Sequence, residues 1–182
     1  FIIVASIPVI FAGLALSLLS PDWVRSVHVV AWATLIFGIV LWIADRFFPT
    51  QKTLKDMNLK SAFLIGMAQV LALIPGTSRS GITMTAARFC GFSRTESARF
   101  SLLLAIIAIA GAGTLSTIDL IRLGDIQLGL DVILALFLSF ISGYIAISLM
   151  MKWLQKASFL PFVLYRIALG AGLLIFLYWP VS

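Results

Sequence analysis

The sequence holds very little of what a water-soluble protein depends on. Only 11% of its 182 residues are charged, it has one cysteine and one histidine, and Glu96 is its only glutamate. A single cysteine excludes a disulfide within the chain and any cysteine-based metal cluster. Disorder is excluded as well, because disordered chains are polar and charged, whereas 62% of these residues are hydrophobic and the mean hydropathy is +1.13. A soluble domain contains roughly 45–50% apolar residues, so this composition indicates an integral membrane protein.

The chain is strongly basic, with a net charge of +6 at pH 7 and an isoelectric point of about 10.0. In a membrane protein, surplus lysine and arginine collect on cytoplasmic loops and contact anionic lipid headgroups. We therefore expect membrane lipids as partners and no nucleic acid.

Five apolar stretches reach, or nearly reach, the roughly 20 residues that a helix needs to cross the bilayer core. Helices are the natural spanning form, because each satisfies its own backbone hydrogen bonds. The predicted fold class is therefore all-α, a polytopic integral membrane protein with a single membrane domain over residues 1–182. The predicted crossings are Phe1–Leu19, Val27–Ala44, Phe100–Ile118, Val132–Met151 and Phe159–Trp179.

A sixth apolar stretch is interrupted in its middle. Ala62–Ile74 and Ile82–Cys90 are each too short to cross, and the polar run Pro-Gly-Thr-Ser-Arg-Ser-Gly at 75–81 separates them. The flanks 45–60 and 88–99 are both basic, so the positive-inside rule places both in the cytoplasm. We therefore predict a re-entrant pair of half-helices over 62–90, which enters and leaves the membrane on one face.

The other loops agree with this topology. Ser20–Ser26 and Asp119–Asp131 carry few basic residues and are expected outside, whereas Lys152 and Lys156 return the chain to the cytoplasm before the last helix. One topology, in which each predicted crossing joins a cytoplasmic loop to an outside loop, then satisfies every loop.

The polar run at 75–81 has the features of an anion-binding site. An arginine at bilayer depth costs roughly 2.5–3.5 kcal/mol on insertion scales, so Arg79 requires a polar pocket or a partner. Its planar guanidinium matches phosphate oxygens, and the half-helix beginning near Ile82 would point its positive end at the same place. Alternatively, Arg79 only fixes the loop by donating to backbone carbonyls. The neighbouring residues that would contact an anion are Gly76, Thr77, Ser78, Ser80, Gly81 and Thr83. Thr83 could instead cap the half-helix that begins near Ile82.

These residues resemble the undecaprenyl-diphosphate phosphatase (bacitracin resistance) family. The likeness extends over essentially the whole chain, and the run at 75–81 is its most specific part. The segments that carry it are Lys60–Gly66 with Gln69, residues 71–81, Gly91–Arg94, Ala98–Ala105, and Ser158–Phe162 followed by Tyr165 and Arg166.

The resemblance implies an enzyme of the bacterial inner membrane, with two inverted repeats that each supply a re-entrant loop. It would hydrolyse undecaprenyl diphosphate, a polyprenyl diphosphate lipid, to undecaprenyl phosphate and inorganic phosphate, and so recycle the lipid carrier of cell-wall synthesis and confer bacitracin tolerance. Carried over to this chain, Arg79, Ser78 and Ser80 would be catalytic, and Gly76, Thr77, Gly81 and Thr83 would bind the diphosphate.

The chain departs from the family pattern in one respect. The family's other re-entrant loop carries two glutamates four residues apart, a serine-rich turn and a histidine, and no such segment exists here. His28, near the predicted outer surface, is expected to be interfacial. Hydrolysis needs a base and usually a cation, so we expect a divalent cation, Mg²⁺ or Ca²⁺, whose ligands lie in about 80 to 90 residues missing before Phe1.

The sequence alone is also compatible with other hypotheses about function and about single residues. Broken half-helices aimed at an anion also suit a transporter or flippase of a lipid phosphate or another anion. Arg166, seven residues into the last predicted helix, is expected to be structural, and Gln69 to make an interhelical hydrogen bond. The sequence is compatible with a homodimer, and it leaves the membrane face of the site undetermined.

Overall fold

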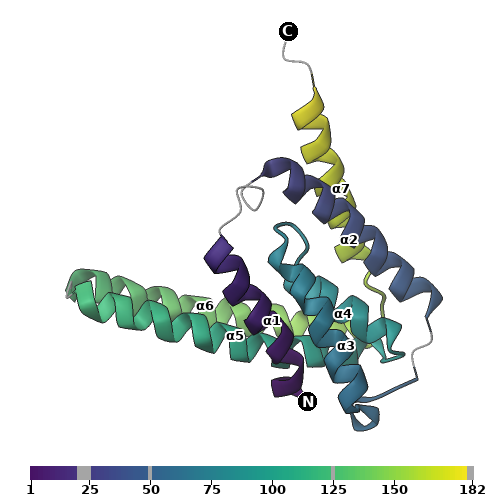
Figure 1. Cartoon of the computed structure of the whole chain (residues 1–182), viewed down its shortest axis with the longest axis horizontal. Coiled ribbons are helices and arrows are strands. Elements are labelled where there is room, and N and C mark those ends of the chain that lie inside the picture. The colour runs from purple at the N-terminus through teal and green to yellow at the C-terminus, as the bar shows by residue number, and fades with distance from the viewer. Residues whose placement is uncertain (20–25, 49–50, 124–125, 180–182) are drawn as a thin grey trace.

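A computed structural model describes residues 1–19, 26–48, 51–123 and 126–179 of the chain (Figure 1). Within these ranges every regular element is helical, as the composition predicts. The α-helices are α1 (Ile2–Leu19), α2 (Val27–Phe47), α3 (Leu59–Val70), α4 (Arg79–Phe89), α5 (Arg94–Leu123), α6 (Ile126–Leu154) and α7 (Leu160–Tyr178), with short 3-10 helices η2 (Leu54–Asp56) and η3 (Leu71–Leu73).

Among the described residues, four helices are long and apolar enough to cross a membrane, and they confirm four of the predicted crossings. They are α1, α2, the part of α6 from Val132 to Leu154, and α7. The fifth predicted crossing, Phe100–Ile118, lies inside α5, whose side chains are described only in part. The chain is therefore a multi-pass membrane protein.

The short helices α3 and α4 form a hairpin whose two outer ends lie side by side. Backbone hydrogen bonds join Lys52, before α3, to Gly91 and Ser93, after α4, at 3.1 and 3.0 Å. Neither helix is long enough to cross, because 12 and 11 residues at about 1.5 Å each reach less than 20 Å. This hairpin has the geometry expected of the re-entrant pair, while its membrane sidedness stays a prediction.

The helix α2 packs between this hairpin and α7. The helices α2 and α7 run antiparallel to each other. Glycines make the contact close: a Cβ on Gly38 would lie 3.1 Å from Cβ of Arg166, and one on Gly170 would lie 2.9 Å from Cβ of Leu35. On the other side, α1 packs on α3, where the carbonyl of Ala5 meets Gly66. The helices α5 and α6 run side by side as a long pair that extends away from these helices (Figure 1).

Several boundaries differ from the sequence-based predictions. The helix α4 begins at Arg79, three residues before Ile82, because Ser78 caps it, so residues 79–81 form its first turn instead of a loop. The helix α5 begins at Arg94 instead of Phe100, which places Glu96 in a helical turn. Residues 119–123 and 126–131 are helical, although a loop was predicted there. Hydropathy located the apolar core of each helix, but helices continue past the bilayer core into water. The loop predicted over 20–26 lies outside the described residues except for Ser26.

Candidate functional site

The polar run forms a tight turn between η3 and α4, and its backbone is unusual at two positions. Gly76 has φ of 89° and Ser78 has φ of 66°, both in the left-handed region that favours glycine. Side chains satisfy this turn: Thr34 Oγ1 donates to the carbonyl of Gly76 at 3.1 Å, and Gly81 N donates to Ser78 Oγ at 3.2 Å. Ser78 is therefore the N-cap of α4.

The turn lies beside the first half of α2, far from the end of α2 at Phe47. Gly76 contacts Val30 and Thr34 of that helix, whereas the other end of α4 contacts the end of α2, where Arg88 Nη2 donates to the carbonyls of Asp45 and Phe48 at 3.2 and 3.0 Å. Thr34 lies 13 residues before the end of α2 at Phe47, which is roughly 20 Å of helix. The candidate site thus lies well inside the length of α2, away from the end of α2 that Arg88 contacts.

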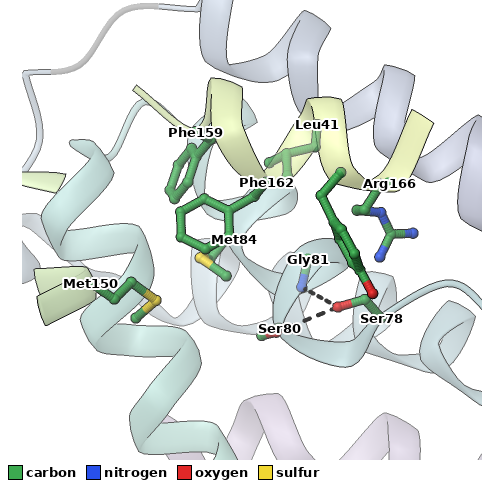
Figure 2. Close-up of a pocket in the computed structure, with 10 residues that line it drawn as sticks. Leu41, Ser78, Ser80, Gly81, Met84, Met150, Phe159, Phe162 and Arg166 are labelled. Carbon is green, nitrogen blue, oxygen red and sulfur yellow. Dashed lines mark hydrogen bonds between the residues drawn. The ribbon is translucent and has the colours of Figure 1, made fainter. Parts of the chain in front are cut away.

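A cavity of about 190 Å³ opens beside this turn, and its wall changes from polar to apolar along its length (Figure 2). The first turn of α4 contributes Ser78, Ser80 and Gly81, and α7 contributes Arg166. The remaining wall is mainly hydrophobic, with side chains from α2, α4, α6 and α7 and from Phe159, which caps α7. Those residues are Leu41, Met84, Met150, Phe159, Phe162 and Tyr165.

The guanidinium of Arg79 points to the other side of the turn and does not line this cavity. Its Nε donates to Gln69 Oε1 at 3.4 Å, and its Nη2 donates to the carbonyl oxygen of Leu104 on α5. This conformation matches the alternative in which the arginine donates to a backbone carbonyl. Gln69 makes the predicted interhelical hydrogen bond, and it is completely buried with an unpaired Nε2. The role of Arg79 as phosphate clamp stays a prediction.

Arg166 is the arginine that lines the cavity, half-buried on α7. Its Nη2 donates to the carbonyls of Thr77 at 2.8 Å, Gly76 at 2.9 Å and Thr34 at 3.4 Å. One side chain therefore connects α7, α2 and the turn. These bonds to backbone carbonyls agree with the structural role that the sequence predicts for Arg166. An arginine inside a predicted membrane helix is also a signal of a polar site.

The two threonines of the predicted site lie away from the cavity. Thr77 is buried with an unpaired Oγ1. Thr83 Oγ1 donates to the carbonyl of Arg79 at 3.0 Å and lies 2.7 Å from Ser101 Oγ on α5. Thr83 thus joins α4 to α5 and does not cap α4, which Ser78 does. Their predicted contact with the substrate remains a prediction.

The part of the chain that the structure describes gathers no group of three or more His, Cys, Asp or Glu side chains that could hold a metal ion. Residues 74–83, which form the turn and the start of α4, contain no carboxylate, the side chain that usually anchors Mg²⁺ or Ca²⁺ in proteins.

A comparison with protein families adds to this geometry. A family model described as "Bacitracin resistance protein BacA" matches residues 1–172. The chain belongs to this family. The BacA family is the one that the run at 75–81 and its flanking segments indicated, so the resemblance is confirmed.

Individual relatives are similar to this chain over nearly its whole length. It is 46% identical over 178 residues to a protein of Roseobacter denitrificans, covering 97% of this chain and 67% of the relative. It is 46% identical over 180 residues to a protein of Maricaulis maris, covering 96% and 67%. A protein of Alteromonas mediterranea is 44% identical over 178 residues, covering 98% and 67%. All three are named undecaprenyl-diphosphatase, and the chain spans about two thirds of their length.

Proposed function

We propose that this protein, like the relatives that it matches, acts as an undecaprenyl-diphosphatase. The reaction would convert undecaprenyl diphosphate, a polyprenyl diphosphate lipid of the bacterial inner membrane, to undecaprenyl phosphate and inorganic phosphate. The names of the relatives support this activity, as does membership of the BacA family.

The observation that carries the proposal is the turn at 75–78 with an arginine on each side of it. Within the described residues, the ion pairs involve Arg88, Arg94 and Arg99, and neither Arg79 nor Arg166 has a carboxylate partner. Both arginines are half-buried among helices of a membrane protein, where a positive charge is costly without an anion. A diphosphate supplies the compensating negative charge, and the adjoining apolar cavity wall suits its lipid tail.

The reaction breaks the bond between the terminal phosphorus and the bridging oxygen of the diphosphate. An oxygen nucleophile adds to that phosphorus and gives its proton to a general base, while the bridging oxygen leaves on the lipid phosphate. Water as the nucleophile gives inorganic phosphate directly, whereas a side-chain nucleophile gives a phosphoryl-enzyme that water then hydrolyses. Negative charge grows on the phosphoryl oxygens, where positioned donors stabilise the transition state. In our proposal Ser78, Ser80 and the backbone N–H groups at the start of α4 supply such donors, with Gly76, Thr77, Gly81 and Thr83 shaping the site. Arg79 supplies positive charge after leaving the carbonyl of Leu104.

The general base, the nucleophile and the ligands of a divalent cation would come from parts of the full-length protein outside this chain. Mg²⁺ or Ca²⁺ would neutralise charge on the diphosphate. The dependence on a cation is tested by adding a chelator to the purified full-length protein and then restoring each ion.

Release of phosphate from a polyprenyl diphosphate in detergent tests the activity. We expect the full-length protein to release phosphate and the Arg79→Ala variant to lose at least about a hundred-fold in kcat. Arg46→Ala is the matched control, because Arg46 is an exposed arginine in the last turn of α2. Unchanged release by Arg79→Ala would remove that residue from the mechanism.

The broken half-helix at membrane depth also favours a second candidate, a transporter or flippase of a lipid phosphate or another anion. Vesicles distinguish the two. Movement of lipid phosphate between leaflets without phosphate release would support transport, whereas release without movement would support the phosphatase alone.

A further inference from the structure

The guanidinium of Arg166 is only partly used by the hydrogen bonds that it makes. Its three described bonds all start from Nη2 and end on backbone carbonyls. Nε is buried without a partner, and Nη1 has no hydrogen bond to any described residue. Nη1 would lie 3.6 Å from a Cβ built on Gly81, which lines the cavity. The side of the guanidinium that carries Nη1 therefore faces the turn of α4 at the cavity.

The surroundings of Nη1 have the chemistry of an anion site. Ser78 Oγ and Ser80 Oγ lie 3.4 Å apart in the same wall, and both side chains are exposed to the cavity (Figure 2). The start of α4 adds the partial positive charge of a helix N-terminus. Carbonyl oxygens hold Arg166 in place but leave its positive charge uncompensated, because they carry no net charge.

We propose that Arg166 is a second phosphate-binding residue, which holds the turn with Nη2 and donates to the diphosphate of the lipid through Nη1. This inference rests on the proposed function and goes beyond the expected role of Arg79. The cavity wall of Leu41, Met84 and Phe162 would then contact the first part of the lipid tail. A cavity of about 190 Å³ can hold a small apolar group, since an engineered cavity of about 150 Å³ binds benzene.

Inorganic pyrophosphate is a suitable probe, because it carries the headgroup charge without the lipid. We expect pyrophosphate to raise the unfolding temperature of the full-length protein in detergent, which gives a dissociation constant. In Arg166→Lys that constant should rise at least about ten-fold, because lysine keeps the charge but cannot donate to the carbonyls and the anion in two directions. KM for the lipid should rise with it.

Two controls separate binding from positioning. Thr34→Val removes the other side-chain donor to the carbonyl of Gly76 and leaves Arg166 intact, so we expect its dissociation constant to stay within about two-fold of wild type. Arg46→Gln should leave it unchanged. Equal weakening by Arg166→Lys and Thr34→Val would show that Arg166 only positions the turn, and unchanged binding in Arg166→Lys would also overturn the proposal.

A measurement on wild-type protein covers the case in which Arg166→Lys does not fold. Phenylglyoxal modifies arginines, and mass mapping follows each one. Pyrophosphate should slow the modification of Arg166 several-fold and leave Arg46 unaffected, whereas equal rates at Arg166 with and without pyrophosphate would refute the proposal. If the lipid is not hydrolysed while Arg166 is protected, the proposed function fails and this inference stands. If the lipid is hydrolysed without protection, only this inference fails.

Discussion

Arg88 and Asp45 join the end of α4 to the end of α2. Arg88 is fully buried, its Nη2 donates to the carbonyl of Asp45 at 3.2 Å, and its Nε lies 3.6 Å from Oδ1 of the same residue. The carboxylate also accepts from Arg94 Nε at 2.6 Å and from the backbone N–H of Phe159 at 3.2 Å. One aspartate therefore connects α2, α4, α5 and the start of α7.

Replacing this aspartate should destabilise the protein strongly. Asp45→Ala leaves the buried guanidinium of Arg88 without its counter-charge, and breaking a buried ion pair from one side costs about 3–5 kcal/mol. We expect the free energy of unfolding of the full-length protein in detergent to fall by about that amount. Asp56→Asn is the control, because Asp56 is exposed and lies outside this group. A fall no larger than that of the control would contradict the prediction.

Gly76→Ala should damage the turn. The added Cβ would overlap the carbonyl oxygen of Val30 and lie 2.9 Å from Thr34 Oγ1, and φ at this position is 89°. Left-handed backbone costs an alanine roughly 1–2 kcal/mol before any overlap is counted. We expect loss of hydrolysis and a lower unfolding temperature. Gly172→Ala on α7, where a Cβ meets no atom within 4 Å, is the matched control and should change neither.

Two substitutions distinguish the two roles proposed for Ser78, capping α4 and donating a hydrogen bond to the substrate. Ser78→Gly suits the φ of 66° and costs only a few tenths of a kcal/mol as a cap, whereas Ser78→Ala should cost about 1 kcal/mol. If the hydroxyl contacts the substrate, both variants lose phosphate release, although only the alanine variant loses stability. Full activity in Ser78→Gly would limit Ser78 to capping. Thermal unfolding and phosphate release are measured on the same samples.

Gly66→Val should separate α1 from α3. Even a Cβ at this position would overlap the backbone of Ala5, including its Cα at 2.7 Å, so the helices must move apart. Overpacking of this kind costs typically 1–3 kcal/mol. We expect a lower unfolding temperature of the full-length protein. Gly13→Ala, where a Cβ would make an ordinary contact of 3.8 Å with Leu73, should be tolerated, and equal effects of the two substitutions would contradict this packing.

Hydropathy and charge determined much of the fold before any coordinates. Long apolar runs have to become helices in a bilayer because their backbone groups find no water there. Neither half of the interrupted run at 62–90 is long enough to cross, and both of its flanks are basic, so the sequence predicted a hairpin that enters and leaves on one face. Helix ends were less predictable: Ser78 caps α4, so the helix begins at Arg79, three residues before Ile82, because one side-chain oxygen that accepts a backbone N–H can begin a helix.

By itself the sequence determined the membrane class, the hairpin and the polar turn, because these depend on composition and on local chain length. Only the tertiary structure decided which arginine faces the cavity. Arg79 is close to the turn in sequence, yet its side chain reaches Leu104 on α5, whereas Arg166 is brought to the turn by the packing of α7 on Gly38 of α2. A long, flexible guanidinium finds carbonyl partners on either side of the turn, so its direction depends on the helices that pack around it.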